Sequence, residues 1–161
     1  MKINHPLMHN NFAKSDMDAL RNLIKNKNLI LTQSKKVQEF EQKWSKWLKV
    51  KYSVFVNSGS SANFISMLIL KNLSKTNKKK EIIVPALTWV SDINSVIMSG
   101  FKPVFVDIDP KNLSMNLEQV KNKINKNTLA VFITHAQGFN GLSESFLKEI
   151  KRKKIILVED V

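Results

Sequence analysis

A run of small polar residues, 57–61 (Asn-Ser-Gly-Ser-Ser), stands between two apolar stretches and is the first candidate for chemistry in this chain. The apolar residues 54–56 are expected to end a buried strand, and residues 64–70 to form a helix. Such a strand-to-helix turn leaves backbone N–H groups free at the positive end of the helix dipole, with serine hydroxyls beside them. The turn predicts a phosphate site, although serine and glycine here could instead serve only as a helix cap.

Three further side chains that could bind a ligand or take part in a reaction each follow an apolar run: Trp89, His135 and Asp160. In an open parallel sheet, ligands bind beyond the carboxyl ends of the strands, so these residues and the polar turn are expected at one edge. A phosphate cradle, an aromatic face and a carboxylate suit a phosphorylated flat ring with a basic nitrogen. A carboxylate beside that nitrogen keeps it protonated, so that the ring draws electrons from a substrate carbanion. The set therefore indicates pyridoxal phosphate.

Each of these residues also has a purely structural interpretation. Trp89 could be ordinary core, His135 a hydrogen-bonded structural histidine, and Asp160 a helix cap. Asp107 and Asp109 are typical of a turn and are assigned no chemistry. The chain has no nucleotide-binding glycine motif, no cysteine and only three histidines, so neither a dinucleotide site nor a metal site is predicted.

The elements that must position the site follow from the apolar pattern. Residues 1–50 are expected to form an N-terminal helical segment, with helices at 16–25 and 34–48. Residues 51–161 alternate short apolar runs with helical stretches, which predicts an α/β fold with a mostly parallel sheet covered by helices on both faces. The expected strands are 52–56, 81–84, 103–106, 129–134 and 154–158. The expected helices between them are 60–72, 91–99, 116–124 and 143–151.

The composition limits the class of protein. A hydrophobic content of 43% is typical of a globular chain, and no apolar run is long enough for a membrane span or a signal peptide. A cytoplasmic location is expected. The net charge of +13 invites a nucleic-acid partner, but the lysines are scattered among asparagines without a basic stripe, so no nucleic-acid or membrane partner is predicted.

Five segments, matched in order, resemble the DegT/DnrJ/EryC1/StrS family, the pyridoxal-phosphate-dependent sugar aminotransferases and their dehydratase relatives. They are 31–41, the polar turn with its flanks 56–63, the tryptophan loop 84–90, Gly-Phe-Lys-Pro-Val-Phe-Val-Asp-Ile-Asp at 100–109, and Val-Glu-Asp at 158–160. The resemblance implies the N-terminal part of a fold-type-I large domain, like that of aspartate aminotransferase, and a homodimer.

The resemblance also implies roles for single residues. Gly59 and Ser60 would contact the cofactor phosphate, with Ser61 as a weaker candidate. Trp89 would stack on the pyridine ring and Asp160 would pair with its nitrogen. His135 falls where the family often has histidine or asparagine near the cofactor.

The Schiff-base lysine of the family is expected downstream of Val161, so no catalytic residue is assigned within this chain. The resemblance implies amino transfer from an amino donor to a nucleotide-linked keto-sugar, in a pathway that supplies cell-surface polysaccharide. One alternative is a 3-dehydratase of the same family, in which histidine replaces the lysine. A second is a truncated, non-catalytic remnant.

Overall fold

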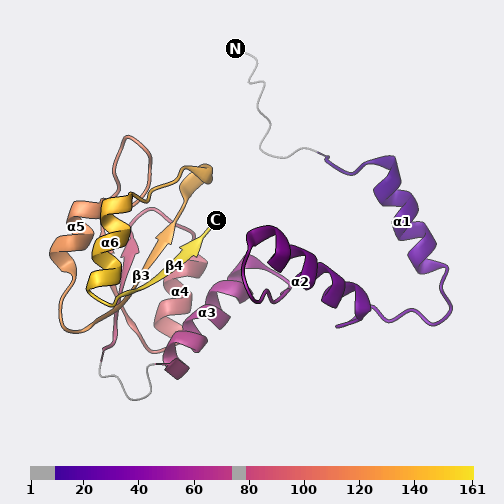
Figure 1. The fold of residues 1–161 in the computed structure, drawn as a ribbon, viewed down its shortest axis with the longest axis horizontal. Helices are drawn as coiled ribbons and strands as arrows, with labels where there is room; N and C mark the ends of the chain where they lie inside the picture. Colours follow the sequence, from indigo (N-terminus) through magenta and orange to yellow (C-terminus); the bar gives the residue numbers. More distant parts are fainter. Residues whose placement is uncertain (1–9, 74–78) are drawn as a thin grey trace, which may run out of the picture. The chain divides into compact units, whose positions relative to one another are not determined.

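The computed structural model describes residues 10–73 and 79–161 and divides the chain into two compact units, 1–55 and 56–161 (Figure 1). Each unit is described by itself. The boundary predicted at residue 50 stays a prediction. Within the described residues, no helix is both long and apolar enough to cross a membrane.

The first unit contains two helices, α1 (Lys14–Ile24) and α2 (Lys35–Leu48), both close to the predicted ranges. Neither helix has a fully buried residue. The aromatic residues of α2 contact one another instead. The ring centroids of Phe40 and Trp44 lie 5.8 Å apart, and those of Trp44 and Trp47 lie 4.9 Å apart.

The first predicted strand, 52–56, is wrong. These residues form no strand, and Tyr52 and Val54 are each 76% exposed. A strand needs a hydrogen-bonding partner, and within the described residues no strand pairs with this segment. Its polar groups contact α2 instead, because Phe55 N–H donates to the Glu41 carboxylate at 2.8 Å.

The second unit is the predicted α/β fold. Its sheet has the order β2-β1-β3-β4, and every neighbouring pair of strands is parallel. The strands are β1 (Glu81–Pro85), β2 (Lys102–Val106), β3 (Thr128–Thr134) and β4 (Ile156–Asp160). The helices are α3 (Gly59–Leu73), α4 (Val90–Met98), α5 (Leu117–Lys123) and α6 (Glu144–Arg152). A short 3-10 turn, η1 (Ala136–Gly138), follows β3.

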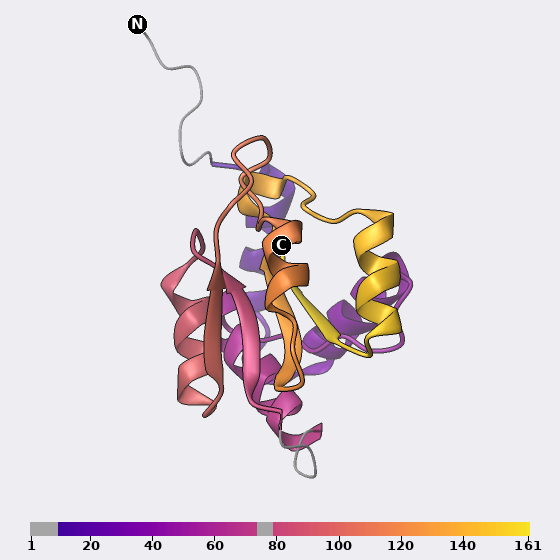
Figure 2. The same cartoon turned by 90° about the vertical axis from the view of Figure 1, so that its left-hand side faces the viewer.

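Helices cover both faces of this sheet, and each face has its own core (Figure 2). Helices α3 and α4 bury Met67 and Val96 against Ile82 of β1 and Phe132 of β3. Helices α5 and α6 cover the opposite face. There Val120, Phe146 and Ile150 pack against Ile83, Val131 and Ile133. Apolar residues on both faces explain why β1 and β3 are continuous apolar runs in the sequence.

Because side chains alternate along a strand, each residue at the strand's end belongs to one known face of the sheet. In β4, Val158 packs with the α3/α4 core and Leu157 with the α5/α6 core. By the same alternation, Asp160 belongs to the α3/α4 face and Glu159 to the α5/α6 face. Thr134, two residues after Phe132 in β3, shares the α3/α4 face with Asp160, and the two residues are partners in the β3–β4 register.

Candidate functional site

The polar turn before α3 presents unpaired backbone donors. The Ser58 hydroxyl oxygen accepts from Ser61 N–H at 3.2 Å, so Ser58 caps the helix and uses one of its first amide groups. The N–H groups of Gly59 and Ser60 have no partner within the described part of the chain. Since these groups lie at the positive end of a helix of 15 residues, the turn can bind an anion through the amides of Gly59 and Ser60.

Asp160 is the last residue of β4, and it is half-buried on the α3/α4 face. Its Oδ2 accepts from the Asn63 side-chain amide at 3.2 Å. Asn63 lies one helical turn after Ser60, so this hydrogen bond joins the end of β4 to the first turns of α3. Burial raises the pKa of the Asp160 carboxyl above its ordinary value, and the negative charge of Asp92 raises that pKa further, while the Asn63 hydrogen bond and His135 lower it.

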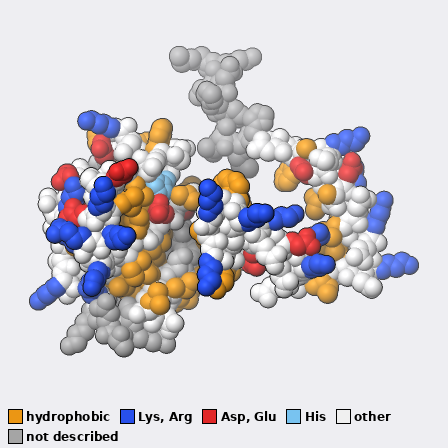
Figure 3. Space-filling view, in the orientation of Figure 1, with side chains coloured by type: hydrophobic (Ala, Val, Ile, Leu, Met, Phe, Trp, Pro, Cys, Tyr) orange, Lys and Arg blue, Asp and Glu red, His pale blue; other side chains and the backbone are white. Residues whose placement is uncertain are grey.

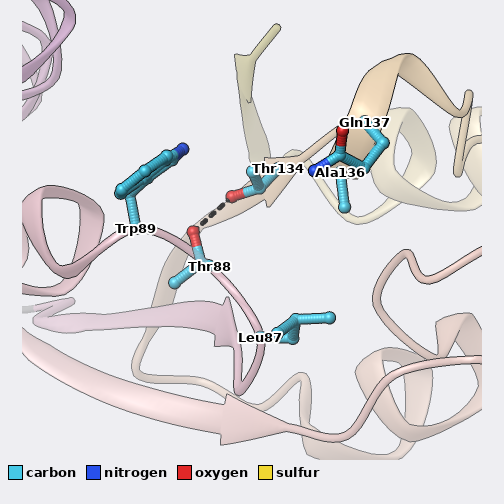
Figure 4. A pocket seen from close by; sticks show the side chains of 6 residues that line it. All are labelled: Leu87, Thr88, Trp89, Thr134, Ala136 and Gln137. Carbon is cyan, nitrogen blue, oxygen red and sulfur yellow. Dashed lines mark hydrogen bonds between the residues drawn. The ribbon is translucent and has the colours of Figure 1, made fainter. Parts of the chain in front are cut away.

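Trp89 projects from the loop between β1 and α4 beside a cavity of about 260 Å³. The other lining residues are Leu87, Thr88, Thr134, Ala136 and Gln137. In Figure 4 the indole stands on one side of the cavity and η1 on the other, with the hydroxyls of Thr88 and Thr134 between them, 2.7 Å apart. Trp89 is 74% exposed, so it is not core, and its ring is available for stacking on a flat ligand.

The His135 backbone and ring lie in different surroundings. Its N–H donates to the Asp160 carbonyl oxygen at 2.9 Å, which holds the start of η1 beside the end of β4. The imidazole Nε2 lies 3.0 Å from the Glu159 carboxylate, and Nδ1 accepts from Gly141 N–H at 3.4 Å. Because Nδ1 is an acceptor, Nε2 carries the hydrogen and donates it to Glu159. Both ring nitrogens are therefore occupied by protein groups.

The structure thus brings together the amides of α3, the Asp160 carboxylate and the Trp89 loop, whereas the His135 ring is engaged with Glu159. A groove lined by Ser60 and Phe64 of α3 and by Val90 and Ser91 of α4 connects the polar turn with the start of the Trp89 helix. Asp107 and Asp109 lie in a turn and accept from Ile108 N–H and Lys111 N–H respectively, as predicted.

Sequence reasoning missed two residues that hold this site together, Asn63 and Asp92. Asn63 is 8% exposed and Asp92 only 1%. Both are polar residues on otherwise apolar helix faces, which is a signal that could have identified them. Within residues 10–73 and 79–161, no group of three His, Asp or Glu side chains could hold a metal ion.

The space-filling view in Figure 3 shows how the basic side chains are distributed on one face of the molecule. On the face drawn in Figure 3, lysine and arginine side chains are dispersed over both units rather than forming one stripe.

Comparison with known proteins gives a family. The model of the DegT/DnrJ/EryC1/StrS aminotransferase family matches residues 10–161. The GDP-4-keto-6-deoxy-D-mannose 3-dehydratase of Yersinia pseudotuberculosis is 29% identical over 160 residues, which cover 98% of this chain and 40% of the relative. The GDP-perosamine synthase of Vibrio cholerae is 34% identical over 109 residues, which cover 68% of this chain and 29% of that protein.

Solved structures give the same fold. The Escherichia coli GDP-4-keto-6-deoxy-D-mannose-3-dehydratase, solved with bound hydrated PLP, matches with a TM-score of 0.84 at 29% identity, over 100% of this chain and 41% of its own. The Helicobacter pylori aminotransferase PseC, involved in the biosynthesis of pseudoaminic acid, matches with a TM-score of 0.82 at 26% identity, over 93% and 39% respectively. The chain spans about 40% of the length of the dehydratases that it matches almost throughout.

Proposed function

The chain belongs to the DegT/DnrJ/EryC1/StrS aminotransferase family, and we propose that it binds pyridoxal 5'-phosphate at the carboxyl edge of its parallel sheet. The observation that carries the proposal is the Asp160 carboxylate. It is half-buried beside α3, where burial and the neighbouring Asp92 charge raise its pKa. A cationic partner stabilises the ionised form of such a carboxyl group, and a protonated pyridine nitrogen is a partner of this kind.

Each assigned residue has one task in this proposal. The N–H groups of Gly59 and Ser60 bind the phosphate, with the Ser60 hydroxyl as a third donor. Ser61 contributes less, because its N–H already donates to Ser58. Trp89 stacks on the ring, and Asp160 keeps the ring nitrogen protonated. When bound, the cofactor supplies an electron sink for a substrate carbanion.

His135 enters the proposal through its backbone rather than its ring. Its backbone N–H donates to the Asp160 carbonyl oxygen at 2.9 Å, which holds the end of β4 beside the start of η1. No residue of this chain is assigned the proton transfers at the substrate carbon, which are the task of a general acid–base group.

For the reaction, we propose amino transfer to the keto group of a nucleotide-linked sugar, in line with the name of a Saccharopolyspora spinosa relative, dTDP-4-dehydro-2,3,6-trideoxy-D-glucose 4-aminotransferase. A 3-dehydratase is the second candidate. It is favoured by one observation: two GDP-4-keto-6-deoxy-D-mannose 3-dehydratases match over 98% of this chain, whereas three GDP-perosamine synthases match over 68–77% of it. Sequencing the gene beyond the codon of Val161 discriminates the two, through a lysine or a histidine at the Schiff-base position.

The proposal includes partners and a place of action. We expect an amino donor, a homodimer and a cytoplasmic reaction that supplies nucleotide sugars for cell-surface polysaccharide. Support for these comes from family membership alone.

The binding proposal is tested with pyridoxine 5'-phosphate, which has no aldehyde and so cannot form imines with the many surface lysines. Equilibrium titration of the purified chain should show saturable binding that is at least about tenfold tighter than that of pyridoxine, which has no phosphate. Equal affinity for the two compounds would contradict a phosphate site at Gly59 and Ser60.

A further inference from the structure

Asp92 is a buried acid for which the proposed function has no task. It lies in the first turn of α4 and is 1% exposed. Burying a carboxylate costs free energy unless hydrogen bonds compensate it. A helix cap on the protein surface would provide the same local stabilisation of α4 without that cost. The surroundings of Asp92 therefore indicate what its burial achieves.

Three donors from three different elements converge on the Asp92 carboxylate. Oδ2 lies within hydrogen-bonding distance of the Thr88 hydroxyl and 2.8 Å from the Thr134 hydroxyl. Oδ1 accepts from the Asn63 amide at 2.7 Å. Thr88 directly precedes Trp89, and Thr134 is the register partner of Asp160. One carboxylate thus contacts the loop that leads to Trp89, the helix that begins at Gly59, and the strand that pairs with Asp160.

The Asn63 side chain links the two acids of this site. Its Nδ2 lies 2.7 Å from Asp92 Oδ1 and 3.2 Å from Asp160 Oδ2. An amide nitrogen has two hydrogens, and here each has its own carboxylate acceptor. With both hydrogens directed in this way, the amide has one orientation, and Asp92 determines where the amide meets Asp160.

From this geometry we propose that Asp92 is a positioning residue of the cofactor site. It acts through the Asn63 amide to fix the Asp160 carboxylate, and through Thr88 to fix the loop that carries Trp89. The proposal rests on the function proposed above, and it adds to it a buried group that does not touch the cofactor.

The charges around Asp160 give this proposal a distinctive signature. Asp92 and His135 are the charged groups that act on Asp160: the Asp92 charge raises the pKa of the Asp160 carboxyl, and His135 lowers it. The Asn63 hydrogen bond also lowers it. Loss of Asn63 and loss of the Asp92 charge should therefore move the pKa of Asp160 in opposite directions. General loosening of the site would expose the carboxyl and lower its pKa in both cases.

The experiment follows the Asp160 carboxyl by NMR titration of the full chain without cofactor. The variants are Asn63→Ala and Asp92→Asn, and Asp109→Asn, an acid of the distant turn, is the control. We expect a higher pKa of Asp160 in Asn63→Ala, a lower one in Asp92→Asn, and the wild-type value in Asp109→Asn. An unchanged pKa of Asp160 in both Asn63→Ala and Asp92→Asn would overturn the proposal.

A second readout uses the ligand. The affinity for pyridoxine 5'-phosphate is divided by that for its carbocyclic analogue, in which C–H replaces the ring nitrogen. Asn63→Ala and Asp92→Ala should each reduce this ratio by about tenfold, because in each variant Asp160 is no longer held toward the nitrogen. An unchanged ratio would overturn the proposal. Since the titration needs no ligand, a wild-type chain that binds neither compound would contradict the proposed function and leave the titration result intact.

Discussion

The carboxylates of Asp92 and Asp160 share one amide nitrogen, that of Asn63, which lies 2.7 Å from the first and 3.2 Å from the second. Two acids this close to one another repel when both are charged. A protonated pyridine nitrogen at Asp160 would place a positive charge beside the pair. Such a charge would relieve the repulsion between the two carboxylates.

Substituting Asp160 should change how stability depends on pH. Because its pKa is raised in the folded chain, the folded chain binds more protons than the unfolded chain between the ordinary value of 3.8 and the raised one. Stability therefore falls as the pH rises through that window. Asp160→Asn should remove this fall and be more stable than the wild type above the window. The difference should shrink as the pH falls through the window and disappear below pH 3.8. Urea unfolding at a series of pH values measures it.

The matched control is Asp107→Asn, which removes the same charge from an exposed turn. This variant should keep the wild-type fall in stability with pH. If the wild type and Asp160→Asn show the same dependence of stability on pH, burial does not raise the pKa of the Asp160 carboxyl, and this prediction is wrong.

Trp89 should affect binding but not folding. The side chain is 74% exposed, so Trp89→Ala should change the free energy of unfolding by no more than about 0.5 kcal/mol. Loss of ring stacking should weaken pyridoxine 5'-phosphate binding by about 3- to 10-fold. Trp47→Ala, at a side chain 70% exposed in the first unit, is the control and should leave the affinity unchanged. Equal losses in the two variants would remove the stacking role of Trp89.

A negative charge in the polar turn should separate helix stability from phosphate binding. Ser60→Asp places a carboxylate in the first turn of α3, where the helix dipole stabilises it by about 0.3–1 kcal/mol. The same charge repels a phosphate, so the affinity for pyridoxine 5'-phosphate should fall by about tenfold or more, while that for pyridoxine stays constant. Ser145→Asp, at the same position in the first turn of α6, is the control. If both variants bind like the wild type, the anion does not lie at Ser60.

Gly141 should tolerate no side chain. A Cβ atom at this position would overlap Oγ and Cβ of the buried Ser114. Gly141→Ala is therefore expected to destabilise the chain by about 1–3 kcal/mol in urea unfolding, because the core must shift. Gly59→Ala, with open space around the added methyl, is the control and should cost little. Adding Ser114→Gly to Gly141→Ala should restore most of the loss, and a double variant as unstable as Gly141→Ala would refute this explanation.

The alternation of helices and strands in the second unit was predictable because it depends on local pattern. A strand covered on both faces is a continuous apolar run, as β3 illustrates, and helices such as α6 begin at a serine that caps them. Segment 52–56 has the same local pattern but is not a strand, because strand formation also requires a partner that no local pattern reveals.

The composition of the site was predictable only in part, for a related reason. Asp160 and Trp89 follow apolar runs, so the edge rule places them together. The contact between Asn63 and Asp160 spans 97 positions of sequence, and the contact between Asn63 and Asp92 spans 29. The His135 imidazole pairs with Glu159 through Nε2. This pairing depends on the face of the sheet to which the Glu159 side chain points, and the sequence pattern alone does not show that face.

The most direct test of the account concerns the ring nitrogen. Binding of pyridoxine 5'-phosphate and of its carbocyclic analogue is measured for the wild-type chain and for Asp160→Asn. We expect the wild type to prefer the nitrogen-containing ring by about tenfold, and Asp160→Asn to lose this preference while still favouring phosphorylated over unphosphorylated ligands. A wild-type chain that binds the two rings equally, or an Asp160→Asn variant that keeps the preference, would contradict the assignment of Asp160 to the cofactor.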